Sequence, residues 1–80
     1  MTIEFIKRPD INGKYIFVNG EMIGNVHTSD DICYNVTIPN FMDKCYIRGF
    51  NSFDLAETKA TEFINECKSA TTNSIPSPNP

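Results

Sequence analysis

The sequence predicts an α+β fold, an antiparallel β-meander of four to five strands with one C-terminal α-helix packed on one face of the sheet. Two observations predict it. Between residues 2 and 48, apolar and polar residues alternate in short segments separated by turn-forming residues, which is typical of strands. Between residues 53 and 67 the apolar spacing changes to three, four and seven, which is typical of one helix face.

Five segments are predicted as strands. They are residues 2–7, 14–19, 21–28, 32–38 and 44–48. Asn19-Gly20 is the strongest turn signal, because both central residues of a type I′ hairpin turn need positive φ. The other turns are marked by Pro9, Asn12-Gly13, residues 29–31 and Pro39-Asn40. The segment 32–38 alternates most cleanly, with Ile32, Tyr34, Val36 and Ile38 on one side.

The hairpin of residues 14–26 has a predicted register. A two-residue turn at Asn19-Gly20 places Phe17 opposite Met22 and Ile16 opposite Ile23. Strict alternation would then put Ile23 and Val26 on opposite faces. A bulge at Gly24 would bring them to the same face, since glycine inside a strand often marks a bulge.

The helix is predicted to begin after Ser52, which suits the N-cap position, with Asp54 in the first turn. We expect it to end near Lys68, so that residues 1–68 form a single domain. Residues 69–80 are rich in Pro, Ser, Thr and Asn and hold three of the five prolines, which predicts a disordered tail.

One helix covers only one face of a sheet, so large side chains must remain on the other face. The predicted core consists of Ile16, Val18, Ile23, Val26, Tyr34, Val36 and Ile38 in the strands and Phe53, Ala56, Ala60, Phe63 and Ile64 in the helix. The open face would then hold Tyr15, Phe17 and Met22, near Asn35 and Thr37. Exposed apolar patches commonly mark interaction sites. Two alternatives stay open: the first strand or the loop 39–43 folds over this face, or two copies pair through it.

Catalytic and metal-binding patterns are missing from the sequence. The single histidine, His27, has no evident partner, and Cys33, Cys45 and Cys67 form no Cys-x-x-Cys pair. We expect no enzyme activity, no cofactor and no metal, with the cysteines reduced. No apolar run is long enough to span a bilayer and no signal peptide is evident, so a cytoplasmic protein is expected.

The net charge of the chain and the positions of its basic residues indicate which class of partner it binds. The formal net charge of −3 argues against free nucleic acid as the main partner. Five basic residues nevertheless cluster in the strands and turns, namely Lys7, Arg8, Lys14, Lys44 and Arg48. A sheet face that carried them would contact phosphate or an acidic protein surface. Ordinary solubilising charge is the simpler interpretation.

Part of the chain resembles a DNA-binding domain of AP2 or integrase-arm type. The resemblance covers residues 34–64, "YNVTIPN…CYIRGFNSFDLAETKATEFI", and rests on Gly49, Phe50, Ser52 and Ala56 at the start of the helix. In those domains a three-stranded sheet followed by a helix reads the major groove. This resemblance implies DNA binding as the alternative function.

The chain is also similar to small phage-encoded inhibitors of the anti-CRISPR type. The shared features are its size, mild acidity, the "NG-x-x-IG-x-V" hairpin and the meander with one helix. The resemblance implies an inhibitor, monomeric or homodimeric, that binds a host Cas protein or nucleoprotein complex and blocks its nucleic-acid binding. The predicted partner-binding residues come from the face assignment: Tyr15, Phe17 and Met22, rimmed by Lys14, Asn35 and Arg48.

Overall fold

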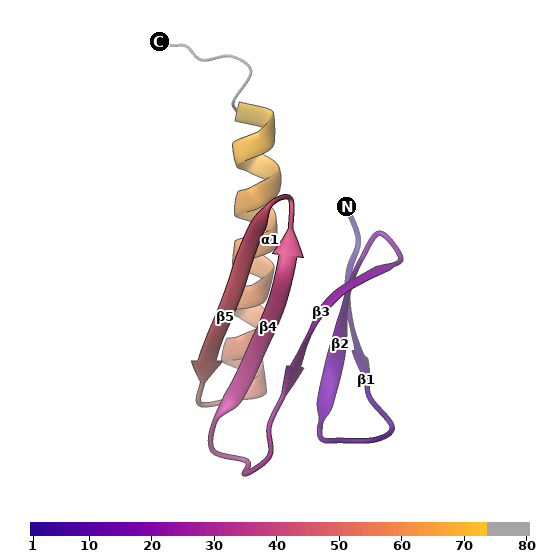
Figure 1. Ribbon diagram of the computed structural model, residues 1–80, viewed down its shortest axis with the longest axis vertical. Coiled ribbons are helices and arrows are strands. Elements are labelled where there is room, and N and C mark those ends of the chain that lie inside the picture. The colour runs from indigo at the N-terminus through magenta and orange to yellow at the C-terminus, as the bar shows by residue number, and fades with distance from the viewer. Residues whose placement is uncertain (74–80) are drawn as a thin grey trace.

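The computed structural model describes the backbone of residues 1–73 and the side chains of residues 1–69. Its elements are β1 (Ile3–Lys7), β2 (Gly13–Val18), β3 (Glu21–His27), β4 (Tyr34–Phe41), β5 (Lys44–Phe50) and α1 (Phe53–Asn73) (Figure 1). The five strands form one antiparallel sheet in the order β1-β2-β3-β4-β5. The predicted α+β meander with one C-terminal helix is therefore confirmed.

The core lies between the sheet and α1. Its buried members are Ile16, Val18, Val26, Val36 and Ile38 from the strands and Ala56, Ala60 and Ile64 from the helix. Ile23, Tyr34, Phe53 and Phe63 pack around these residues and are partly buried. The predicted core is thus confirmed, because the helix stripe and the clearest strand stripe do face each other.

The predicted bulge at Gly24 is present. Ile16 pairs with Gly24 and Phe17 pairs with Met22, so Ile23 is the extra residue and the expected pairing of Ile16 with Ile23 is wrong. The bulge brings Ile23 to the core side. Gly24 is required there, because a Cβ atom would lie 2.3 Å from the backbone oxygen of Thr37.

The turns differ in how well the sequence predicts them. Asn19 and Gly20 have φ values of 52° and 83°, as a type I′ turn requires. The expected stop of the fourth strand at Pro39-Asn40 is wrong, since β4 continues to Phe41. Pro39 lies beyond the part of β4 that pairs with β3, at an irregularity in the β4–β5 ladder, so its missing N–H breaks no regular pairing.

Other boundaries also differ from the prediction. β5 continues to Phe50, past the expected end at Arg48, and the ends of β1, β2 and β3 differ by one residue. Ile32 belongs to the turn before β4 and is 73% exposed, so it does not extend the buried stripe of that strand. The helix starts as expected, with Ser52 Oγ accepting a hydrogen bond from the backbone N–H of Leu55 at 3.1 Å. It continues to Asn73, past the expected end at Lys68, because no proline occurs between Lys68 and residue 76. Residues 74–80 of the predicted tail lie outside the described residues.

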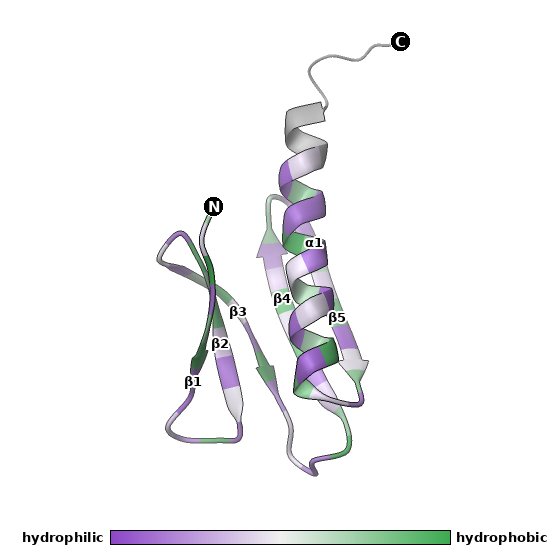
Figure 2. Cartoon of the chain, turned by 180° about the vertical axis from the view of Figure 1, so that it is seen from behind, coloured by the Kyte–Doolittle hydropathy of each residue, from purple (hydrophilic) through white to green (hydrophobic). Residues whose placement is uncertain are grey.

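The helix covers the sheet unevenly. It packs on β4 and β5 and reaches β3, whereas β1 and β2 lie to its side (Figure 2). Two surfaces are consequently left without a covering layer by the residues that the structure describes. One is the whole face of the sheet opposite α1, and the other is the strip between α1 and the edge strand β1.

Candidate functional site

An apolar patch lies on the face of the sheet opposite α1, called the open face below. Residues paired directly across an antiparallel ladder point to the same face. Tyr15 pairs with Ile6 and Phe17 pairs with Met22, and all four alternate with core residues, so they form one group on the open face. Ile6 is 45% exposed and Met22 53%, while the two rings between them are half-buried.

A polar strip continues the open face across β3 and β4. It consists of Asn25, His27, Asn35 and Thr37, because Asn25 pairs with Thr37 and His27 with Asn35. His27 Nδ1 lies 3.2 Å from Asn25 Oδ1, which orients the ring within the strip. Tyr15 pairs with Asn25, so the strip and the apolar patch are contiguous.

The structure brings four of the six predicted partner-binding residues together. Tyr15, Phe17, Met22 and Asn35 are all on the open face, as expected. The predicted alternative, that another segment covers this face, is wrong for the described residues: β1 is the edge strand of the sheet, and Phe41 packs against the core on the helix side.

Lys14 and Arg48 lie on the other face, so the predicted rim is wrong in these two places. Lys14 alternates with Tyr15 and shares the face of the core. Its Nζ is 2.6 Å from Glu57 Oε2 and 5.5 Å from the centre of the Phe53 ring. Arg48 pairs with the buried Val36, which fixes it on the helix side.

The open face carries little charge. Its cation is Arg8, whose guanidinium lies 4.6 Å from the centre of the Tyr15 ring. Asp10 accepts two hydrogen bonds from this guanidinium, at 2.8 and 3.1 Å, and the pKa of Asp10 is lowered as a result. Glu4, paired with Phe17, adds one carboxylate. The other basic strand residues, Lys7, Lys14, Lys44 and Arg48, face the helix side, because Lys7 pairs with Lys14, Lys44 with Phe41 and Arg48 with Val36. The open face is therefore not a basic surface.

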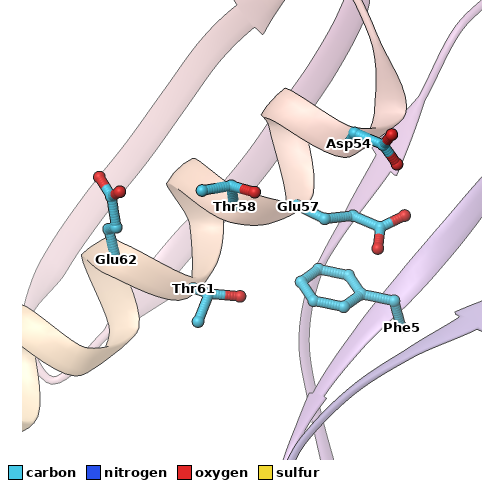
Figure 3. A pocket seen from close by; sticks show the side chains of 6 residues that line it. All are labelled: Phe5, Asp54, Glu57, Thr58, Thr61 and Glu62. Atoms are coloured by element: carbon cyan, nitrogen blue, oxygen red, sulfur yellow. The ribbon is translucent and has the colours of Figure 1, made fainter.

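A groove separates α1 from β1 on the helix side of the sheet. It holds about 420 Å³ and is lined by Phe5, Asp54, Glu57, Thr58, Thr61 and Glu62. The Phe5 ring points toward Glu57 and Thr61 across the gap (Figure 3). Sequence reasoning missed this groove, although one signal was available: Phe5 shares the face of the core and no predicted helix residue was assigned to cover it.

No protein-family model, curated protein or solved structure matches the chain. Within residues 1–73, no group of three or more His, Cys, Asp or Glu side chains is arranged to hold a metal ion, and no helix is both long and apolar enough to cross a membrane. The open face and the groove are the two surfaces on which a functional interpretation can be built.

Proposed function

We propose that the chain is a non-enzymatic, cytoplasmic binding protein whose open face docks on a partner protein. The apolar patch of Ile6, Tyr15, Phe17 and Met22 is the observation that carries this proposal. Aromatic residues and Met are enriched in protein interfaces, and a few aromatic side chains within a polar rim commonly supply most of the affinity. The polar strip provides such a rim on one side of the patch.

The distribution of charge favours a protein partner over free nucleic acid. Phosphate contacts require Lys and Arg side chains directed at the ligand. On the open face the Arg8 guanidinium is already bound to Asp10, and Lys14 and Arg48 lie on the other side of the sheet. No observation on this face supports the DNA-binding alternative.

The narrower proposal is an inhibitor of the anti-CRISPR type. Such a protein would occupy a surface of a host Cas protein or nucleoprotein complex and so exclude its nucleic acid. The resemblance in size and topology supports it, as does the net charge of −3, which favours approach to a basic nucleic-acid-binding surface.

Capture from a bacterial lysate with matched variants tests the proposal. Immobilised wild-type chain should retain a specific protein, and Phe17→Ala should lose it while keeping a cooperative thermal transition. Asn65→Ala, exposed on α1, is the matched control and should retain the same protein. Unfolding of Phe17→Ala would make Phe17 a core residue, and unchanged capture by the folded variant would place the interface elsewhere.

Salt dependence separates the two function classes. Binding at a nearly neutral open face should weaken far less between 50 and 200 mM salt than binding by a duplex-DNA binder with six or more phosphate contacts, which should lose about a thousandfold or more in affinity. Anisotropy of a labelled duplex measures this directly. Tight, salt-sensitive binding of free duplex would reject the protein-partner proposal.

A further inference from the structure

The pairing of β1 with β2 shows which backbone N–H and C=O groups of β1 point outward from the sheet. Thr2 O accepts a hydrogen bond from Asn19 N at 2.8 Å, and Arg8 N donates to Gly13 O at 2.9 Å. Both pairs continue the β1–β2 register, in which hydrogen-bonded and non-hydrogen-bonded pairs alternate. The even-numbered residues of β1 therefore bond to β2, and the N–H and C=O groups of Ile3, Phe5 and Lys7 point away from the sheet.

The same three residues have their side chains on the helix side, because they pair with Val18, Ile16 and Lys14. A strand added to this edge would form a hydrogen-bonded pair with Phe5, and the side chain opposite Phe5 would share its face. That side chain would enter the groove between Phe5 and α1 (Figure 3).

The groove is lined by carboxylates. Its six lining residues include Asp54, Glu57 and Glu62 and no basic side chain, and the Phe5 ring faces them from β1 (Figure 3). Glu57 already pairs with Lys14 and Glu62 with Lys59, so Asp54 is the carboxylate that an added cation would meet without displacing a lysine. The same pair of contacts is present beside the groove, where Lys14 Nζ lies 5.5 Å from the centre of the Phe53 ring and 2.6 Å from Glu57 Oε2. A cation beside an aromatic ring and a carboxylate gains both cation–π and ion-pair attraction.

We propose that the β1 edge is a second binding site, which takes an extended peptide segment of a partner protein by strand addition, with a Lys or Arg of that segment inserted over Phe5. Main-chain hydrogen bonds to Phe5 supply the alignment and the groove supplies the selectivity. The groove and the open face lie on opposite sides of the sheet. Binding at one is therefore separable from binding at the other, and failure of the open-face proposal would leave this one standing.

Amide chemical shifts measured in a peptide titration test the site. The probe is an acetylated and amidated peptide, Thr-Val-Thr-Arg-Thr-Val-Thr, whose Arg and Val side chains share one face when extended. At about 1 mM peptide, which detects even weak binding, the shifts should move in β1 and in the groove-facing turns of α1, at residues 54–62. The same peptide with citrulline in place of Arg should bind about tenfold more weakly, since it keeps the shape but lacks the charge.

Matched protein variants locate the binding. Thr61→Lys places a competing cation in the groove wall and should weaken binding of the probe peptide about tenfold or more. Asn65→Lys adds the same charge on an exposed helix position outside the groove and should leave binding unchanged. Phe17→Ala should also leave it unchanged, because Phe17 belongs to the open face.

Three results would overturn the proposal: no shift changes at this peptide concentration, equal binding of the citrulline peptide, or shifts confined to the open face. A dilution series of the chain alone is the remaining control. If dilution changes the chemical shifts of the β1 amides and Thr61→Lys abolishes that change, the occupant of the edge is a second copy of the chain and the peptide proposal is wrong.

Discussion

At the scale of single residues, Gly24 lets two strands approach closely at the bulge in β3. A Cβ atom at this position would lie 2.3 Å from the backbone oxygen of Thr37 and 2.9 Å from Ile38 Cγ1. Backbone cannot yield as a flexible side chain can, so Gly24→Ala should destabilise the fold by about 3 kcal/mol. That is a large share of the roughly 4–11 kcal/mol expected for a domain of this size.

Gly20 provides the matched control for Gly24. It has φ of 83° and open space around its Cβ position. Gly20→Ala should therefore cost only the conformational penalty of about 1–2 kcal/mol. Urea unfolding of both variants measures the difference, and equal losses would contradict the steric account of Gly24.

Asp30 makes stability depend on pH. Its carboxylate accepts hydrogen bonds from the backbone N–H of Cys33 at 3.0 Å and of Ile32 at 2.9 Å, and these bonds, Cys33 first, lower its pKa. The unfolded pKa is about 3.9. With the folded value lower, the contribution is complete above about pH 4 and is lost as pH falls through the folded pKa.

Asp30→Asn should lower stability at neutral pH and flatten the loss of stability below about pH 4. Urea midpoints measured from neutral to acidic pH give this dependence. The pKa of Asp10 is lowered by the hydrogen bonds from Arg8, and Asp10 makes its own contribution to the pH dependence of stability in both proteins. An acid limb of the same steepness in the variant would show that the Asp30 hydrogen bonds do not couple to folding.

Residue-level prediction failed where the face of a side chain depended on information outside its own segment. Alternation with Ile16 already places Lys14 on the core side, and the predicted rim overlooked it. Arg48 was harder, because "KCYIR" has no dominant stripe and its face follows only from the pairing with Val36. Tyr15, Phe17 and Met22 were assigned correctly because the Asn19-Gly20 turn fixes the register next to it.

At the scale of elements, the β4–β5 hairpin has an unusual turn. Met42 and Asp43 occupy its central positions with φ of 54° and 67°, values that suit Asn and Gly far better than Met. The double substitution Met42→Asn with Asp43→Gly should stabilise the fold by about 1 kcal/mol and raise Tm by roughly 4–8 °C. Thermal unfolding measures it, and an unchanged or lower Tm would show that Met42 makes compensating contacts.

An ion pair joins α1 to β2 beside the shared core. Lys14 and Glu57 are joined at 2.6 Å with side chains 33% and 24% exposed, so the pair is only partly screened by water. Glu57→Gln should cost about 1 kcal/mol in the free energy of unfolding. The exposed pair Lys59–Glu62, at 3.4 Å, is the control, and Glu62→Gln should cost about 0.3 kcal/mol or less. Equal costs would mean that the Lys14–Glu57 pair contributes no more to the free energy of unfolding than an exposed surface pair does.

The elements themselves were largely predictable, and their ends were not. Period-two and helical spacings located all five strands and the helix, because burial on one face imposes them. Pro39 misled the prediction of where β4 ends, since its compatibility with a strand depends on which neighbour pairs at that point. The groove beside β1 also escaped prediction, because the sequence does not specify how far the helix axis is offset from the centre of the sheet.

At the scale of the whole molecule, an off-centre helix on a five-stranded sheet leaves two unequal surfaces. The open face is broad and nearly neutral, with its apolar patch on β1, β2 and the start of β3. The groove at the β1 edge is open to solvent and lined by three carboxylates. This division predicts two classes of contact, one with a folded partner surface and one with an extended basic segment.

Site-specific photo-crosslinking tests the central claim, that the open face is the docking surface, most directly. p-Benzoylphenylalanine placed at Met22, which is 53% exposed, should give a covalent adduct with a protein in bacterial lysate, and the same group at Asn65 on α1 should not. Adducts from position 65 with none from position 22, or adducts with nucleic acid alone, would contradict the account.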